Sequence, residues 1–554
     1  MKLLFIAFTV LLLFTGALAQ HDHHSSNEAK PMTLNTGLGE VSHPVSTSNQ
    51  QAQRFFNQGL ALVYGFNHDE AVRSFKRAAE LDPKLAIAHW GVSLALGPNI
   101  NQPIDAEHEQ AAYEALQKAR ALAAGASEAE RAYIEALTKR YSNDPKANLS
   151  KLDVDYKNAM ADVARRYPDD LDAATLYAES LMDLRPWQFW SSNGKPAEGT
   201  EEIVAVLESV LRRNPDHLGA NHYYIHAVEA SPHPEWALPS AQRLKVLAPA
   251  AGHLVHMPAH IDIRTGYYEA AARSNAYAAE ADREYFKATG EQGMYPMMYY
   301  SHNLHFLAVA NSMQGRYQDA KRAADQLNEH LAGYLKAGGP MIEAMVPMID
   351  AFTPTPTLIM VRFRRWEDIL KTPQPDHKLV VTSTLWHFAR GMAYASTGKI
   401  ESAEKEQSLV ASAVKTFPAD AMYGPLNKLS TVLGIIENVL SAKIVIAKAD
   451  KRSSIAFLKK AVELQDSRNY TEPEDWYIPV RESLGAALIS NGEPAEAERV
   501  FRMEIEQHPR SGRALFGLRE SLTAQGKKLA AELAGKEFEV AWKNADTTLR
   551  LEDL

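Results

Sequence analysis

Histidines are concentrated in one part of this sequence, and their spacing is that of metal ligands on helices. Nine of the 20 histidines fall within residues 217–305. His222 and His226 are four residues apart, and so are His256 and His260, a spacing that places two imidazoles on one helix face. The chain has no cysteine, so imidazole, carboxylate, amide or backbone oxygen must hold any transition metal. The pattern therefore predicts a site for zinc, iron, manganese, copper or nickel.

These histidines recur at equivalent positions of three successive predicted helices. Each of three predicted repeats has an alanine in its second helix, namely Ala237, Ala271 or Ala320. Histidines occur 18, 15 or 11 residues before these alanines, and Glu229 lies 8 residues before Ala237. The offsets differ by 3 or 4 residues, so each set shares a helix face. Because neighbouring helices pack roughly 8–10 Å apart, the imidazoles are expected to converge. The predicted metal ligands are His222, His226, Glu229, His253, His256, His260, His302 and His305.

Other polar side chains near the histidines are candidates for catalysis and ligand binding. The predicted general base is Glu229, or Glu179 if Glu179 is not itself a metal ligand. A metal ion with an open coordination position would activate water or oxygen. The inner groove of the array is expected to bind a peptide, a protein or a small polar ligand. Two other interpretations stay open: a metal-free polar groove, and hydrogen bonds that only lock the repeats together. The predicted groove residues are Glu179, Asp183, Asn221, Tyr224, Tyr299 and Asn303.

Internal repeats indicate the elements that must position these side chains. Offsets of 12, 4, 3 and 5 residues, typical of the 34-residue tetratricopeptide repeat, separate Gly59, Ala71, Phe75, Ala78 and Pro83. Offsets of 12, 4 and 8 recur near the C-terminus at Gly485, Ala497, Phe501 and Pro509. The sequence therefore predicts an all-α solenoid of helical hairpins.

Composition divides the chain into further segments. Lys2, the apolar stretch 3–14 and the small residues before Gln20 are typical of an export signal. Cleavage near Ala19 would leave a periplasmic or secreted protein without a stable membrane anchor. The net charge of −9, with no clustered basic face, argues against nucleic-acid binding. The predicted segments are a signal (1–19), a flexible His/Ser-rich segment (20–50), an N-terminal array (51–337), a Gly/Pro/Met-rich interruption (338–356), a C-terminal array (357–530) and a tail (531–554).

Several motifs resemble a family of long exported bacterial tetratricopeptide proteins. They are Gly97–Asn101 (GPNIN), Tyr177–Met182 (YAESLM) with Arg185–Trp187 (RPW), Gly219–Glu229 (GANHYYIHAVE), Gly252–His260 (GHLVHMPAH) and Glu472–Trp476 (EPEDW). The similarity runs from about residue 50 to 525. It implies a right-handed superhelix whose first helices line the inner groove, and it implies no activity. Family members often carry two cysteines around the positions of Leu85 and Ala88, so no role of those thiols transfers to this chain.

Overall fold

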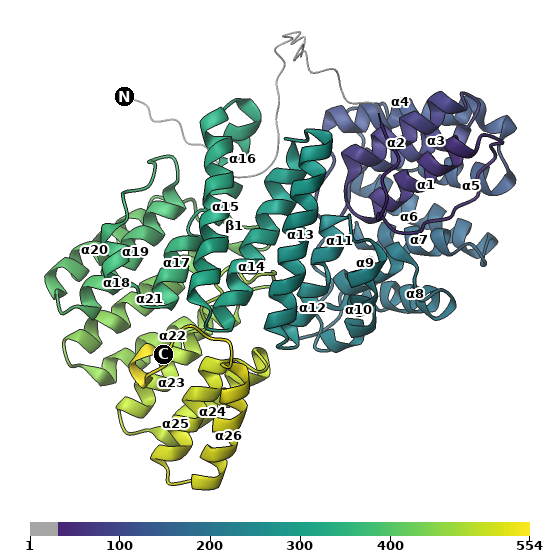
Figure 1. The fold of residues 1–554 in the computed structure, drawn as a ribbon. Coiled ribbons are helices and arrows are strands. Elements are labelled where there is room, and N and C mark those ends of the chain that lie inside the picture. Colours follow the sequence, from purple (N-terminus) through teal and green to yellow (C-terminus); the bar gives the residue numbers. More distant parts are fainter. Residues whose placement is uncertain (1–31) are drawn as a thin grey trace, which may run out of the picture. The chain divides into compact units, whose positions relative to one another are not determined.

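The computed structural model describes residues 32–554, and over this range the protein is built almost entirely of α-helices (Figure 1). The all-α prediction is confirmed. The predicted signal and the His21–His24 tract lie outside the described residues. The described chain forms two compact units, residues 32–303 and 304–554, and the division falls inside helix α14 (Ser301–Met313) rather than at the predicted interruption 338–356.

The unit of residues 32–303 consists of helices that pack as successive antiparallel hairpins. Its helices are α1 (Gln50–Tyr64), α2 (His68–Leu81), α3 (Ala86–Ala95), α4 (Ala106–Leu122), η1 (Ala123–Gly125), α5 (Glu128–Leu137), α6 (Leu149–Arg166), α7 (Leu171–Met182), α8 (Thr200–Arg213), α9 (Leu218–Val228), η2 (Pro234–Ala237), α10 (Leu238–Leu247), α11 (Gly252–His256), α12 (Pro258–Arg264), α13 (Tyr268–Thr289) and the π-helical turn η3 (Pro296–Tyr300).

The unit of residues 304–554 continues the same kind of hairpin. After α14 it contains α15 (Tyr317–Ala337), α16 (Pro340–Phe352), α17 (Thr355–Arg362), α18 (Trp366–Lys371), α19 (Val380–Ser396), α20 (Ile400–Val414), α21 (Leu429–Ala447), α22 (Lys451–Asp466), α23 (Val480–Ser490), α24 (Pro494–Gln507), α25 (Gly512–Ala524), α26 (Lys528–Ala541) and η4 (Leu551–Asp553). One short antiparallel pair joins β1 (Met422–Tyr423) to β2 (Asn427–Lys428). The predicted interruption is thus helical, since α16 and α17 occupy most of it.

The glycines that recur in the repeats leave space for a phenylalanine side chain between neighbouring helices. Phe75 of α2 is fully buried, and a Cβ atom at Gly59 or Gly91 would lie 2.6 or 2.4 Å from its ring. Phe501 of α24 has the same relation to Gly485, where a Cβ atom would lie 2.3 Å away. Any larger residue would overpack these contacts, a change that typically costs about 1–3 kcal/mol. This packing is the physical reason for the glycine-to-phenylalanine spacing seen in the sequence.

Residues 32–49, which we call the N-terminal strap, differ from the flexible segment that their composition predicts. The strap is extended chain, and it lies against the helices of its unit through repeated hydrogen bonds. Gln58 Oε1 accepts from the amide of Asn35 at 2.7 Å, and Glu130 Oε1 accepts from the amide of Ser46 at 2.8 Å. Side chains of the helices thus form the hydrogen bonds that the backbone of an isolated polar segment would form with water.

The predicted C-terminal tail is also folded. Residues 528–541 form α26, and the chain then returns to its own unit, where Asp546 accepts from the amides of Tyr317 and Gln318 at the start of α15. Leu554 is buried. Apolar positions on α26 and the capping role of Asp546 explain why this segment is ordered.

Two helical stretches, Pro340–Arg362 and Leu429–Ala447, are long and apolar enough to cross a membrane by length and composition alone. Half of the first and 44% of the second are buried inside the protein. In α21 the buried side chains include Leu433, Ile436 and Leu440, which serve the core of the unit. The absence of a membrane anchor remains a prediction.

A buried histidine makes the stability of the 304–554 unit depend on pH. His508 Nδ1 lies 2.6 Å from Glu504 Oε1, and its Nε2 lies 3.0 Å from Glu474 Oε1. Burial alone lowers the pKa of His508, but Glu504 and Glu474 outweigh it and raise that pKa to about 10. Because this exceeds the unfolded value near 6.5, the stabilisation is complete below pH 6.5 and is lost as the pH rises toward 10.

We therefore expect the free energy of unfolding to fall between pH 7 and 10, and more steeply in the wild type than in His508→Gln. Urea denaturation of both proteins across this range measures the difference. Equal slopes would show that His508 does not carry the charge assigned to it.

Candidate metal centre

Six of the predicted histidines come together in the 32–303 unit as two groups of three. Triad A consists of His222, His226 and His253, and triad B consists of His256, His260 and His302. Within each triad, one ring nitrogen of every histidine lies within 4.8 Å of the others. Each triad therefore combines histidines at the three offsets of 15, 11 and 18 residues, and neighbouring helices contribute to each.

Triad B brings two acceptor nitrogens face to face. His256 Nδ1 donates to Asn275 Oδ1 at 2.8 Å, and His260 Nδ1 donates to Glu229 Oε2 at 2.5 Å. Because an oxygen acceptor fixes a proton on each Nδ1, each ring presents a lone pair on Nε2 in its neutral form. These two Nε2 atoms are 2.7 Å apart, and His302 Nε2 lies 3.1 Å from that of His256. Two facing lone pairs repel each other unless a cation lies between them.

Two of the nitrogen separations, 3.2 Å in triad A and 3.1 Å between His256 and His302 in triad B, are close to those of ligands on one ion, whereas the 2.7 Å between His256 and His260 is shorter. With metal–nitrogen bonds of about 2.0–2.1 Å and tetrahedral angles, two ligand nitrogens are about 3.3 Å apart. In triad A, His222 Nε2 and His253 Nε2 are 3.2 Å apart. His222 Nδ1 donates to the backbone carbonyl of Tyr64 at 2.6 Å, so its Nε2 presents a lone pair. His226 Nε2 is buried without a hydrogen-bond partner among the described residues.

Glu229 joins the two triads. Its Oε1 accepts from His226 Nδ1 at 2.7 Å and its Oε2 accepts from His260 Nδ1 at 2.5 Å. Burial alone would raise the pKa of Glu229, but His260 and His226 hold it well below its usual range. Both oxygens of the carboxylate are thus engaged by His226 and His260, an arrangement that suits an orienting group better than the predicted metal ligand or general base. Carboxylates in this position fix the tautomer and the orientation of ligating histidines.

Burial favours the neutral form of four of the imidazoles, which is the form that binds a metal ion. Burial lowers the pKa of His222, His253 and His256 well below the usual value, and neighbouring histidines lower it further. Burial also lowers the pKa of His226, although Glu229 opposes the shift.

Aromatic rings enclose the histidines, which do not lie in an open groove as expected. His222, His226, His253, His256 and His260 are each at most 3% exposed, and His302 is partly exposed. The Phe66 ring lies 4.6 Å from that of His222 and 5.5 Å from that of His253. Trp187 packs edge-on against His226 at 5.2 Å, and Tyr299 against His253 at 4.7 Å. A buried site of this kind keeps bulk water from the ligands.

His305, a predicted ligand, has a different environment. Its ring packs edge-on against Phe352 at 5.3 Å and Tyr477 at 5.6 Å, all within the 304–554 unit. Burial lowers its pKa to about 4. His302 and His305 are three residues apart on α14 and so point about 60° away from each other around the helix axis. His305 thus packs, half-buried, against aromatic rings and is not part of either triad.

Glu179 and Asp183 also depart from the prediction, because they meet an arginine. Arg140 Nη2 donates to Asp183 Oδ2 at 2.5 Å. Burial and the nearby Asp183 raise the pKa of Glu179 well above its usual value. The raised pKa favours the protonated form of Glu179, which cannot accept a proton as the predicted general base would.

The remaining predicted groove residues support helices. Asn221 Nδ2 donates to the carbonyls of Pro215 and His217 at the start of α9. Asn303 Nδ2 donates to Asp282 Oδ2 at 2.7 Å. Tyr224 donates to Glu208 of α8, away from the triads. Tyr299 alone of this set contacts a triad ring.

Sequence reasoning missed the groups that orient the ligands. Asn275 lies on α13, and its Nδ2 donates to the carbonyl of Ala271, which fixes its Oδ1 toward His256. A polar residue four positions after a helix-packing alanine is the only signal that could have indicated it. The hydrogen bond from His222 to the backbone carbonyl of Tyr64, 158 residues earlier, could not be predicted from the spacing of side chains.

A third cluster, of His43, Asp170 and Asp172, is close enough to hold an ion but is already satisfied. Asp172 accepts from His43 and Tyr64, and Asp170 accepts from Tyr133 and caps α7. We therefore assign this cluster to the attachment of the N-terminal strap.

Residues 52–85 match the tetratricopeptide repeat. No curated protein matches this sequence. Together with the hairpins described above, the match defines an all-α helical-repeat protein that contains a tetratricopeptide repeat.

Similar solved structures include the APC/C hetero-tetramer Cut9–Hcn1 (12% identity over 89% of this chain and 74% of that chain, TM-score 0.29). Others are the human IFIT1 dimer with m7Gppp-AAAA (10% identity, 90% and 96%, TM-score 0.32) and yeast Tom70 (12% identity, 90% and 93%, TM-score 0.29). With TM-scores near 0.3, these likenesses carry no argument about function, and the lack of nucleic-acid binding remains a prediction.

Proposed function

We propose that this chain binds two divalent transition-metal ions, one in each histidine triad, within its helical-repeat scaffold. The observation that carries the proposal is the convergence of one ring nitrogen from each of three histidines, within 4.8 Å of one another, in each triad. In triad B the Nδ1 atoms of His256 and His260 both donate to oxygen, so that their Nε2 atoms, once about 3.3 Å apart, would both bind an ion. In triad A, Nε2 of His222 and Nε2 of His253 are 3.2 Å apart, and the Nδ1 of His222 donates to the carbonyl of Tyr64.

The ligand set narrows the metals predicted from the sequence. All six proposed ligands are imidazoles, because Glu229 is engaged by His226 and His260. Imidazole suits zinc, copper, iron and nickel, whereas manganese prefers carboxylate and water oxygens. Three protein ligands per ion leave a position for a further ligand, as in catalytic zinc sites.

Elemental analysis tests the proposal. The full chain, purified without a polyhistidine tag and with His21, His23 and His24 replaced by serine, would be loaded with Zn(II), Cu(II), Ni(II) or Fe(II) and desalted. We expect about two ions per chain and an X-ray absorption spectrum with nitrogen in the first shell. The unmodified chain is the matched control for metal held by the N-terminal tract. No retained metal after loading would overturn the proposal and favour a metal-free scaffold for a peptide or protein.

We further propose that the protein is exported, on sequence grounds alone. Lys2 and the apolar stretch 3–14 support the proposal, and they precede the described residues. N-terminal sequencing of the secreted or periplasmic protein is expected to begin near Gln20. A chain that retains Met1 in the cytoplasm would contradict this.

A further inference from the structure

The N-terminal strap is held by side chains that are dedicated to its backbone. Gln53 accepts from the amide of Val45 and donates to the carbonyl of His43, at 3.0 and 2.8 Å. Gln58, which is buried, bonds in the same two-sided way to Asn35 and Thr33. Paired amide contacts of this kind fix an extended chain in one register.

The strap crosses the beginnings of successive helices. Beyond α1, five of its partners lie within four residues of the start of α3, α5, α7, α9 or α11. Gly37 and Gly39 have positive φ angles of 81° and 95°, which let the backbone approach its partners closely. The contacts, in order, join Thr47 to Asp82, Ser46 to Glu130, His43 to Asp172, Gly39 to Leu218 and Gly37 to Ala250.

Three of these contacts lead to the helices that carry triad A. The carbonyl of Gly37 accepts from the amide of Ala250 at 2.8 Å, two residues before α11. Gly39 packs against Leu218, the first residue of α9. His43 Nδ1 donates to Asp172 Oδ2 at 2.8 Å.

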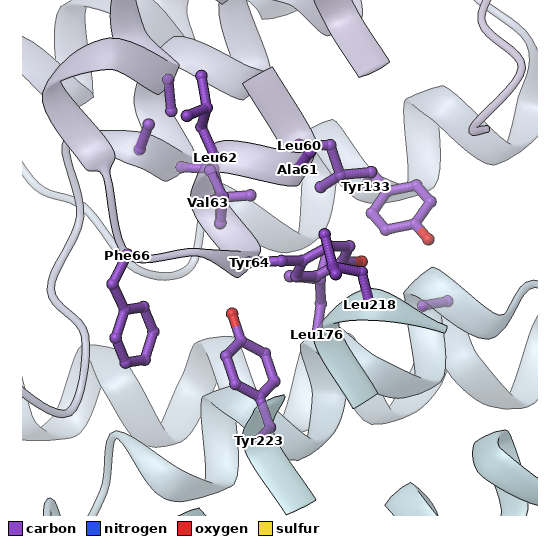
Figure 2. Close-up of a cluster of buried hydrophobic side chains, with 14 of the residues drawn as sticks. Leu60, Ala61, Leu62, Val63, Tyr64, Phe66, Tyr133, Leu176, Leu218 and Tyr223 are labelled. Atoms are coloured by element: carbon purple, nitrogen blue, oxygen red, sulfur yellow. The ribbon is translucent and has the colours of Figure 1, made fainter. Parts of the chain in front are cut away.

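Asp172 connects the strap, through Tyr64, to a proposed metal ligand. Its Oδ1 accepts from Tyr64 OH at 2.5 Å and lies 3.2 Å from Nε2 of His217, the N-cap of α9. The backbone carbonyl of the same Tyr64 accepts from His222 Nδ1. Figure 2 shows the Tyr64 side chain beside Leu176, Leu218 and Tyr223, where packing holds it in place. Tyr64 thus contacts Asp172, which holds the strap, through its hydroxyl group, and the proposed metal ligand His222 through its carbonyl group.

We propose that the N-terminal strap is a clamp that positions α9 and α11 and thereby sets how tightly the histidine centre retains its metal. The inference rests on the proposed metal binding. These two helices carry four of the six ligands, His222, His226, His253 and His256. Metal sites require ligand positions held to within about 0.5 Å, so a release of the clamp loosens both triads. Residues that orient a ligand from behind typically change metal affinity by about 10–100-fold.

The double variant Gly37→Val/His43→Leu disrupts two anchors of the strap, the bond at Gly37 and the bond from His43 to Asp172, in the full chain. A valine at position 37 would be strained at φ 81° and crowded by Ala250 Cβ at 3.2 Å. Leucine at position 43 keeps apolar contact with Phe56 and Tyr133 while removing the bond to Asp172. We expect metal release to a chelator to become about tenfold faster and the Cu(II) electron paramagnetic resonance spectrum to broaden, while helix content is unchanged.

Two matched variants separate clamping from general destabilisation. His43→Asn, in an otherwise wild-type chain, places an amide donor where Nδ1 stood and is expected to keep release as slow as in the wild type. Thr47→Val removes the bond to Asp82 at the far end of the strap, where the neighbouring helices carry no proposed ligand, and is expected to leave release unchanged. Hydrogen exchange over residues 32–47 reports whether the strap has opened.

The outcomes distinguish this inference from the proposed function. Wild-type protein that binds no metal overturns both. Wild-type protein that binds metal, with a double variant whose strap exchanges freely but whose release rate is unchanged, overturns the clamp alone. A strap that stays protected in the double variant would also overturn it, because the two anchors would not be what holds it.

Discussion

Replacement of His222 with alanine is expected to remove one metal ion per chain, replacement of His256 to remove another, and the double substitution to remove both. Each triad would keep two imidazoles after one is lost, and two neutral nitrogens hold an exchangeable divalent ion far more weakly than three. His222 and His256 are the central members of their triads, with Nε2 contacts of 3.2 Å to His253 and of 2.7 Å to His260.

Metal content after desalting, with circular dichroism of the same samples, measures this effect. Helicity should not change, because both side chains point into the centre and neither caps a helix. His233→Ala is the matched control, since His233 is 53% exposed and contacts Glu235 and Trp236 rather than a triad. Retention of two ions by the double variant would refute the assignment of ligands. Loss of both ions from one single variant would show that the triads form one indivisible site.

Substitution of Glu229 with glutamine is expected to weaken metal binding in both triads, by about 10–100-fold each. The carboxylate accepts from His226 Nδ1 and from His260 Nδ1, and it serves one triad through each oxygen. An amide can accept from one of these groups, but its NH2 group then meets the N–H of the other. That histidine must rotate or move its proton to Nε2, which removes the lone pair needed for the metal.

Chelator competition at constant pH measures the two affinities. Glu235→Gln is the control, because this carboxylate bonds to an exposed histidine and lies outside the centre. An effect confined to one triad would show that glutamine keeps its oxygen toward a single histidine. Metal affinities equal to those of the wild type would show that Glu229 does not orient the proposed ligands.

The sequence by itself determined the helical-repeat fold. Gly59, Phe75 and their counterparts near the C-terminus recur because a fully buried ring needs glycine opposite it. The same local logic placed His222 with His226, and His256 with His260, because residues four apart on a helix share a face. Residues 52–85 match the tetratricopeptide repeat where these offsets predict one.

The tertiary structure decided which side chains meet and what each one does. The offset from a packing alanine treats His302 and His305 as equivalent to earlier ligands, yet only His302 reaches His256, while His305 packs on Phe352 and Tyr477. Spacing shows which residues share a face of one helix. The residues opposite that face depend on how other helices are rotated and shifted.

Only distant contacts settle protonation and orientation. Glu229 resembles a ligand in the sequence, but the His260 side chain 31 residues away makes it an orienting acceptor. The carbonyl of Tyr64 is decisive for His222 and has no side-chain signature. The strap, polar in composition, is ordered because glutamine and carboxylate side chains of the helices satisfy its backbone. Local periodicity follows from the geometry of a single helix, whereas these hydrogen bonds exist only once the helices have packed.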